Sequence, residues 1–442
     1  MSTELLDINE KKLIVSSMAE NLIGSEIINL AWQINDKIAQ GQKIFNLTIG
    51  DFDPNIFPLP EALTEEIKKA YDEHHTNYPP ANGTHDLREV VSSFLTKRAG
   101  LDYTPDEILI TSGARPIIFT AYNTIVDLDE VIIFPVPSWN NNHYTHFVDG
   151  EHIVIEAKAE NNFMPTADEI RPYIKEASFI SLCSPQNPTG TTFRKKDLQA
   201  ICDMIVEENN RREKNEKKLY LMFDQMYCQL TYGSIEHYNP VTLNPAMRPY
   251  TVFIDAVSKI FAATGVRVGW CMGPANILNK MKAILSHVGA WAPMAEQKAV
   301  ARYLLQTDAI HQYLAHYKKE IEERLNLIYE GLINLKKEGL AIDAVAPEAA
   351  IYLTIKIDLT GKKLIDGTGF ENQADVTSFI LKEAKLAIVP FYAFGASKNS
   401  PWYRLSVGTC KKEEIKEMLS KLRKALEQVQ ELIFIDQKIK RF

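Results

Sequence analysis

The stretch DAVSKIFAATGVRVGW, residues 255–270, sets one lysine and one arginine among small and apolar residues. Lys259 is flanked by valine, serine, isoleucine and phenylalanine, and desolvation by such neighbours lowers the pKa of a lysine and makes its amine a nucleophile. Arg267 follows in the same stretch, and a fixed guanidinium near such a lysine suits a phosphorylated aldehyde cofactor. Taken alone, the stretch also fits a lysine whose stem packs while its head reaches water, and an arginine in a structural ion pair.

The bulk composition bounds the class of protein. The chain has 442 residues, 45% hydrophobic and 24% charged, which is enough for about two packed globular units. A formal net charge of −8 argues against a nucleic-acid-binding surface, because such a surface needs a basic face. No apolar run approaches the ~20 residues of a membrane span, and the charged start MSTELLDINEKK differs from a signal peptide. The five cysteines are scattered without a C-x-x-C pair, so we expect a cytoplasmic protein with free thiols.

Apolar periodicity separates a central α/β region from flanking helical segments. Residues 27–42 have helical spacing, and the proline-rich DFDPNIFPLP that follows Gly50 indicates a boundary. From there to about residue 295, short apolar runs alternate with helical stretches, as is typical of a mostly parallel sheet. The pattern then predicts an amphipathic helix over 298–335, a strand over 349–358 and a helix over 411–433. We expect the charged interval EENNRREKNEKK, residues 207–218, to be a solvated helix end and loop without a function.

A polar group follows each expected strand of the central region. The strands are EILIT, EVIIFP, SFISLC, KLYLMFD and YTVFIDA, at residues 107–111, 130–135, 178–183, 218–224 and 250–256. In open parallel sheets ligands collect at the carboxyl ends of the strands, so we expect these groups to form one site. In strand order they are Ser112 to Pro116, Ser138 with Trp139, Asn187, Asp224 with Tyr227, and Ser258 with Lys259.

The segment TSGARP, residues 111–116, could bind an anion. Gly113 permits a tight turn, and Pro116 suits the first position of a helix, where its missing N–H costs nothing. Free N–H groups near Ala114 and Arg115 could then hold a phosphate. By itself the segment equally fits an ordinary strand-to-helix turn.

With these residues in view, the chain resembles the class I/II aminotransferases, the pyridoxal phosphate (PLP) enzymes of fold type I. The resemblance covers nearly the whole chain through motifs in the family's order: GDFDP (50–54), YPPANGTHDLR (78–88), TSGAR (111–115), PSW (137–139), SPQNPTG (184–190), FDQMY (223–227), SKIFAATGVRVGW (258–270) and YRLSVG (403–408). It implies an α/β fold with a mostly parallel seven-stranded sheet flanked by helices, plus a smaller α+β domain built from both termini. The implied domains are an N-terminal arm with part of the small domain (1–53), a large PLP-binding domain (54–297), and an interdomain helix with the C-terminal small domain (298–442).

The resemblance further implies roles around the cofactor ring. Lys259 would form the Schiff base with PLP and later move a proton between the substrate α-carbon and the cofactor. Asp224 would keep the pyridine nitrogen protonated, so that the ring acts as an electron sink. Tyr227 and Asn187 would hydrogen-bond the ring 3-oxygen, and Trp139 would stack on the ring face.

Around the phosphate, the resemblance implies contacts from Arg267, from Ser258 and from the backbone of Gly113, Ala114 and Arg115. The family usually has a serine or glycine at the position of Ala256, so a phosphate hydroxyl is missing there. Ser258 or Ser112 could supply it.

Substrate and partner contacts are implied in the same way. Arg404 would bind the substrate α-carboxylate as a bidentate pair, in a pocket that Gly50, Trp139 and Asn187 also line. Tyr78 would reach the phosphate of the neighbouring subunit's cofactor, which implies a homodimer with shared sites.

The nature of the substrate rests on fewer residues. In aspartate-using relatives of this subgroup, a cation at the position of Arg115 contacts the distal carboxylate, which favours aspartate with 2-oxoglutarate. The family's PGxxFG occurs here as PFYAFG, residues 390–395, and its added bulk keeps an aromatic or broad-specificity aminotransferase as the alternative. A PLP-dependent β-lyase or decarboxylase on the same fold is a further alternative.

Simpler interpretations of single residues stay open at this point. Asp224 also fits a helix N-cap, Trp139 core filling, and Asn187 a turn ahead of a proline. His143 and His146 have no third ligand nearby in the sequence, so we expect no metal site. A non-catalytic member of the fold is disfavoured because Lys259, Asp224, Arg267 and Arg404 are all present.

Overall fold

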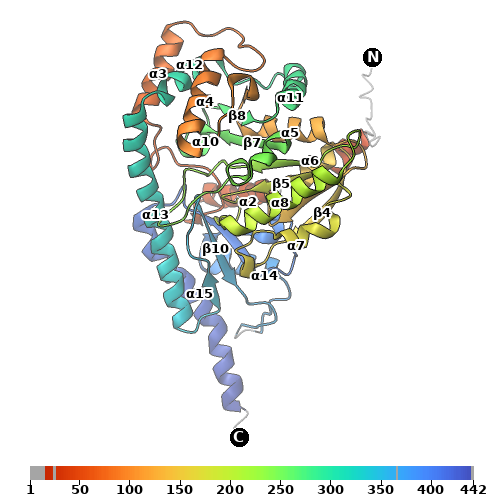
Figure 1. The fold of residues 1–442 in the computed structure, drawn as a ribbon. Helices are drawn as coiled ribbons and strands as arrows, with labels where there is room; N and C mark the ends of the chain where they lie inside the picture. Colours follow the sequence, from red (N-terminus) through yellow and green to blue (C-terminus); the bar gives the residue numbers. More distant parts are fainter. Residues whose placement is uncertain (1–14, 23–25, 365–366, 440–442) are drawn as a thin grey trace, which may run out of the picture.

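The computed structural model describes residues 15–22, 26–364 and 367–439, so the N-terminal MSTELLDINEKK lies outside the described part. In that part, a seven-stranded sheet forms the centre of the molecule (Figure 1). From edge to edge it contains β2 (Ile108–Thr111), β8 (Gly269–Met272), β7 (Thr251–Ala256), β6 (Tyr220–Asp224), β5 (Ala177–Cys183), β3 (Val131–Val136) and β4 (Glu151–Glu156). Of these described strands β8 alone runs antiparallel to its neighbours, so the sheet is mostly parallel, as the sequence predicts.

Two of these strands were not among those expected from the sequence. β4 lies at an edge of the sheet, and most of its residues are exposed, so its apolar run is only the three residues 153–155. β8 has four residues and begins with a glycine, so it is too short to show a strand period.

Helices cover both faces of the sheet. One face packs against α5 (Ala114–Ile125), α6 (Asn141–Phe147) and α11 (Ala275–Val288). The other packs against α4 (His85–Ala99) and α8 (Lys195–Arg211). Because successive strand residues point to opposite faces, a strand buried on both faces is apolar throughout, and this explains runs such as YLMF in β6.

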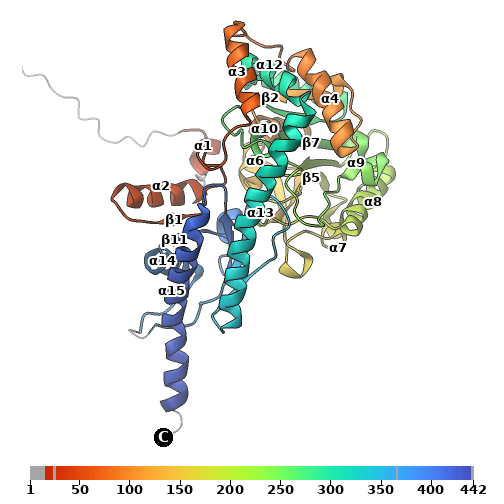
Figure 2. The same cartoon turned by 90° about the vertical axis from the view of Figure 1, so that its left-hand side faces the viewer.

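The helix predicted over 298–335 consists of two helices. α12 (Met294–Leu304) ends before α13 (Thr307–Lys337) begins, and the backbone of Gln306 between them is not helical. Figures 1 and 2 show α13 running from the central sheet to the C-terminal part of the molecule.

Both ends of the chain contribute to a second region. Its four-stranded antiparallel sheet has the order β12 (Val389–Pro390), β13 (Trp402–Ser406), β10 (Tyr352–Ile357) and β9 (Ile342–Ala344) within the described residues. β1 (Phe45–Asn46) pairs in parallel with β11 (Leu386–Ala387), so the N-terminal segment joins the C-terminal one, as expected for a small domain built from both termini. The boundaries at residues 53 and 297 stay predictions.

The remaining helices complete the two regions. They are α1 (Ser17–Asn21), α2 (Glu26–Ala39), α3 (Glu61–Asp72), α7 (Ala167–Ile170), α9 (Pro240–Leu243), α10 (Val257–Ile260), α14 (Gln373–Glu383) and α15 (Lys412–Ile439). Among the residues described, no helix combines the length and apolar character that crossing a membrane requires.

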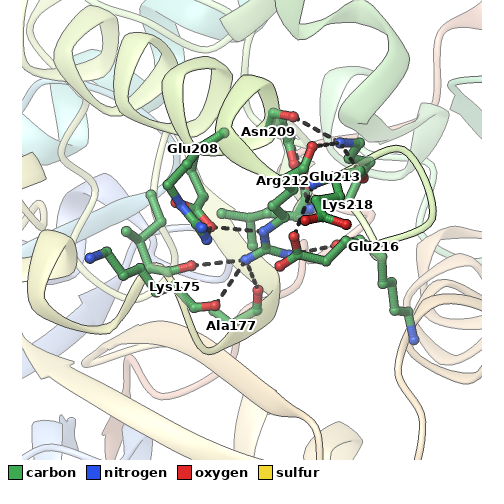
Figure 3. Close-up of polar contacts among 12 residues, drawn as sticks. Lys175, Ala177, Glu208, Asn209, Arg212, Glu213, Glu216 and Lys218 are labelled. Carbon is green, nitrogen blue, oxygen red and sulfur yellow. Dashed lines mark hydrogen bonds and ion pairs between the residues drawn. The ribbon is translucent and has the colours of Figure 1, made fainter.

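The charged interval 207–218 is only partly solvated, contrary to our expectation. The Arg212 side chain is 4% exposed, and its guanidinium donates to Glu208 Oε1 at 2.8 Å and to the Ala177 carbonyl at 2.7 Å (Figure 3). It also donates to the carbonyls of Ile174 and Lys217. Arg212 therefore ties the end of α8 to the start of β5, while Glu213 to Glu216 are exposed as expected.

Replacing Arg212 by methionine should destabilise the fold. The variant Arg212→Met leaves several buried carbonyl oxygens unpaired, and we expect a loss of about 3 kcal/mol in the free energy of unfolding. Arg211→Met is the matched control, because Arg211 pairs with the same Glu208 but is half exposed. Urea unfolding of both variants checks this, and equal midpoints would contradict the structural role of Arg212.

Candidate active site

A cavity of about 610 Å³ opens where the carboxyl ends of the central strands meet the C-terminal region. Its volume lies within the usual range for small-molecule sites. The structure brings most of the site residues suggested by the sequence to its wall: Gly50, Ala114, Arg115, Trp139, Asn187, Asp224, Tyr227, Ser258, Lys259, Arg267 and Arg404. They come from all three predicted segments of the chain.

Lys259 lies in the short helix α10, directly after β7, and its amine points into the cavity. Nζ donates to the Gly50 carbonyl at 2.6 Å and lies 5.5 Å from the centre of the Phe52 ring. Burial lowers the pKa of Lys259 from 10.5 to about 8; Asp51 raises this pKa, and the nearby guanidinium groups lower it. Because a neutral amine is a nucleophile, Lys259 is suited to attack a carbonyl carbon near neutral pH.

Asp224 ends β6 on the same wall of the cavity. Burial raises the pKa of its carboxyl to about 6, and the Met226 N–H, which donates to Oδ1 at 3.0 Å, opposes that rise. The hydrogen bond from the Met226 N–H is the kind that a capping role for Asp224 would require. The Asp224 carboxyl also lines the cavity. It can therefore pair with a cationic group of a bound ligand.

An anion-binding corner forms between α5 and the turn before β8. The Arg267 guanidinium donates to the carbonyls of Thr264 at 2.8 Å and Ser112 at 2.9 Å. A Cβ at Gly113 would lie 2.3 Å from Arg267 Nη2 and would displace the guanidinium, and the φ of +78° at Gly113 also favours glycine. The N–H groups of the first turn of α5 start at Ala114 and lack partners within the helix. Together they can hold a phosphate.

Two details of this corner differ from the sequence expectation. α5 begins at Ala114, so Pro116 is the third helical residue and not the first, although an N–H there would still lack an intrahelical acceptor. Ser258 lines the cavity, whereas Ser112 contributes its carbonyl to Arg267. Of the two candidate hydroxyl donors, Ser258 is the better placed.

Arg404 also lines the cavity and is 1% exposed. Nη1 donates to Asn187 Oδ1 at 2.9 Å and Nη2 to the Thr48 carbonyl at 2.6 Å. Within the described structure its buried Nε has no hydrogen-bond partner. Asn187 thus orients a guanidinium and is more than a turn residue.

Many cavity residues were not singled out from the sequence, and Tyr352, Asp51 and Ile27 are among them. Tyr352 in β10 places its hydroxyl 2.6 Å from that of Tyr227, and its ring lies 4.8 Å from the Arg404 guanidinium. Asp51 and Ile27 also line the cavity. The sequence analysis recognised the segments that contain two of these residues, the GDFDP motif with Asp51 and the expected strand over 349–358 with Tyr352. It did not indicate which side chain of each segment faces the cavity.

Arg115 and Trp139 contact each other on the cavity wall. The guanidinium of Arg115 lies 4.8 Å from the Trp139 ring, and Trp139 is half-buried. Trp139 therefore presents aromatic surface to the cavity and is not simple core filling. Of the bulky PFYAFG residues, Phe394 packs on Arg404, and Phe391 packs on Phe163.

Some residues lie outside the cavity wall. Tyr78 is 83% exposed and its ring packs edge-on against Trp291, 5.5 Å between centroids. His146 donates to the Met18 carbonyl at 2.7 Å. In the described residues no group of His, Cys, Asp and Glu side chains could hold a metal ion.

The chain is similar to known proteins over most of its length. The family model described as Aminotransferase class I and II matches residues 42–422. Aspartate aminotransferase of Geobacillus stearothermophilus is 28% identical over 374 residues, which are 84% of this chain and 88% of that protein. The solved aspartate aminotransferase of Rhizobium meliloti superposes with a TM-score of 0.85 at 25% identity, covering 94% of this chain and 99% of that one. A solved aromatic aminotransferase of Pyrococcus horikoshii gives a TM-score of 0.78 at 25% identity, covering 89% and 98%.

The lowered pKa of Lys259 can be measured by chemical labelling. In protein freed of bound carbonyl compounds, labelling of its amine by a small amine-reactive reagent should rise with pH around a midpoint of about 8, because the neutral form reacts. Lys43, whose pKa is raised above 10.5 chiefly by its hydrogen bond to Glu417, is the control and should react at higher pH. Mass spectrometry of the labelled peptides checks both, and equal midpoints would contradict the desolvation of Lys259.

Proposed function

The chain belongs to the class I and II aminotransferases, which are PLP-dependent transaminases, and from this we propose that it transfers the amino group of aspartate to 2-oxoglutarate by a ping-pong mechanism through a Schiff base on Lys259. One observation carries the proposal. The partly buried amine of Lys259, the partly buried carboxyl of Asp224 and the buried guanidinium of Arg404 line one cavity.

The residues of the cavity fit PLP. The corner made by Arg267, Gly113 and the start of α5 suits its phosphate, and Lys259 suits its aldehyde. When bound, PLP supplies an electron sink for the electrons of the bond broken at the substrate α-carbon. Asp224, with a pKa of about 6, is mostly ionised at neutral pH, and a cationic ring nitrogen beside it would favour the carboxylate further.

Lys259 is placed to carry protons. Its Nζ is held by the Gly50 carbonyl, so the amine points across the cavity, and its pKa of about 8 lets it take up and release a proton near neutral pH. In the proposed reaction, Lys259 Nζ takes the proton from the substrate α-carbon and returns it on the cofactor side.

Arg404 is placed to bind the substrate α-carboxylate. Asn187 and the Thr48 carbonyl fix the guanidinium from behind, and Nε still lacks a partner. A guanidinium group held in one orientation in this way suits a bidentate pair with a carboxylate.

The preference for aspartate rests on Arg115. Its guanidinium is held against Trp139 on the cavity wall, where it can meet a distal carboxylate. Aspartate aminotransferases among the relatives support this assignment. The alternative is an aromatic or broad-specificity aminotransferase, which the apolar Ile27 and Trp139 in the same wall and the aromatic aminotransferase among the structural neighbours favour.

A homodimer is part of the proposal. Tyr78 is exposed outside the cavity of its own chain, and its ring packs on Trp291, so it is available to a second copy. A solution mass equal to one chain would contradict this assembly.

Lys259→Ala should abolish amino transfer. Purified protein with aspartate and 2-oxoglutarate should form glutamate, and the variant should form none, because no other residue has the amine at this position. Lys318→Ala is the matched control, since burial also lowers the pKa of Lys318, which lies outside the cavity wall. Glutamate from the Lys259 variant would contradict the assignment. In the wild-type protein, release of keto acid and ammonia without glutamate would favour the β-lyase, and release of carbon dioxide without glutamate would favour the decarboxylase.

Arg115→Gln should reduce kcat/KM for aspartate by roughly 10- to 100-fold, the usual value of a hydrogen bond to a charged group. The value for phenylalanine should stay the same or increase, because its side chain makes no ion pair. Arg171→Gln, at an exposed arginine away from the cavity, is the control. Unchanged kinetics with aspartate would favour the aromatic or broad-specificity alternative.

A further inference from the structure

A second tyrosine lies directly behind Tyr227. The hydroxyl oxygens of Tyr352 and Tyr227 are 2.6 Å apart, and their rings meet edge to face with 5.5 Å between centroids. Both side chains are buried, and burial raises the pKa of both phenols, so both keep their hydrogens at neutral pH. A chain of two neutral hydroxyl groups therefore leads into the cavity.

The backbone of Tyr352 is fixed by contacts with the central region. A Cβ at Gly190, in the SPQNPTG turn, would lie 2.3 Å from the Tyr352 carbonyl oxygen, so β10 packs directly on this turn. Thr354 Oγ1 donates to the Thr189 carbonyl at 2.8 Å. These contacts hold the Tyr352 hydroxyl in one place relative to Tyr227.

Tyr352 also contacts the other parts of the site. The Arg404 guanidinium lies 4.8 Å from its ring, because Arg404 pairs with Thr354 and so lies diagonally opposite Tyr352. The Tyr352 hydroxyl would be 2.9 Å from a Cβ at Gly50, the residue whose carbonyl accepts from Lys259. Tyr352 thus lies between Tyr227, Arg404 and Gly50, whose carbonyl holds the Lys259 amine.

We propose that Tyr352 is a positioning residue for Tyr227: its hydroxyl donates to the Tyr227 oxygen, so that the Tyr227 hydrogen points to the 3-oxygen of PLP. This inference rests on the proposed function, in which Tyr227 faces that ring oxygen. A phenol has one hydrogen, so when Tyr227 donates to the ring, Tyr352 must be the donor of the bond between them. Such a chain polarises its members and makes Tyr227 a stronger donor.

The visible absorption of the PLP-loaded protein reports this effect. A hydrogen bond donated to the 3-oxygen stabilises the deprotonated form of that oxygen. It therefore lowers the pKa of the proton that the oxygen shares with the Lys259 nitrogen. The variant Tyr352→Phe should therefore raise the pKa of the spectral change by about half to one unit. Because phenylalanine keeps the ring beneath Arg404, we expect kcat to fall more than KM rises.

A double-mutant cycle separates an effect through Tyr227 from a direct one. Tyr227→Phe should raise the spectral pKa more than Tyr352→Phe does, and the double variant should titrate like Tyr227→Phe alone. Additive shifts would overturn the proposal, because Tyr352 would then act on the cofactor without Tyr227.

Tyr403→Phe controls for the loss of a buried hydroxyl. Tyr403 lies on the neighbouring strand β13, and its hydroxyl accepts from Gln373 Nε2 at 2.5 Å, so its loss should leave the spectral pKa unchanged. Equal shifts in the Tyr403 and Tyr352 variants, or no shift in the Tyr352 variant, would overturn the inference while leaving the proposed function in place. Absence of the visible band in the loaded wild-type protein would contradict the proposed function itself.

Discussion

The hydrogen bond from Lys259 Nζ to the Gly50 carbonyl joins residues 209 positions apart in the sequence and orients the central amine of the site. A carbonyl carries no full charge, so it directs the amine without restoring the pKa that burial lowers. The contact also brings the backbone at Gly50 close to Tyr352, because a Cβ at Gly50 would be only 2.9 Å from the Tyr352 hydroxyl. The pairing of β1, which precedes Gly50, with β11 anchors this segment to the C-terminal region. The site is therefore complete only when the N-terminal segment, the central sheet and the C-terminal sheet are all in place.

The guanidinium groups of the site follow the same principle. Arg404 is held by a side-chain amide and a backbone carbonyl, and Arg267 is held by two backbone carbonyls. Among the described residues, neither forms a salt bridge with a carboxylate. Their guanidinium groups are thus fixed by neutral acceptors. Preorganised charges of this kind bind anions without first breaking an ion pair.

The sequence predicted those features that depend on strand order and chemistry. The carboxyl ends of parallel strands meet at one edge, so Asp224, Lys259 and Asn187 could be placed together without a structure. Tyr352 could not, because its place depends on the register between β10 and β13 and on close packing against Gly190. Arg212 was missed for a related reason. Most of its partners are backbone carbonyls, and these leave no pattern in the sequence.

The charges of the cavity narrow the question of the substrate. In the proposed arrangement the phosphate of PLP meets Arg267, the α-carboxylate of the substrate meets Arg404, and Asp224 meets the ring nitrogen. Of the other charged side chains on the described cavity wall, Arg115 and Asp51 have opposite signs. Asp51 Oδ1 accepts from the Phe52 N–H at 2.8 Å, and Arg115 stacks on Trp139, so each is held by a neighbour other than the opposite charge. An acidic substrate is favoured if its side chain lies nearer to Arg115 than to Asp51, because the attraction must exceed the repulsion at the same site. The distances of the substrate side chain from Arg115 and from Asp51, and not the net charge of the cavity, therefore determine whether aspartate is preferred over an uncharged amino acid.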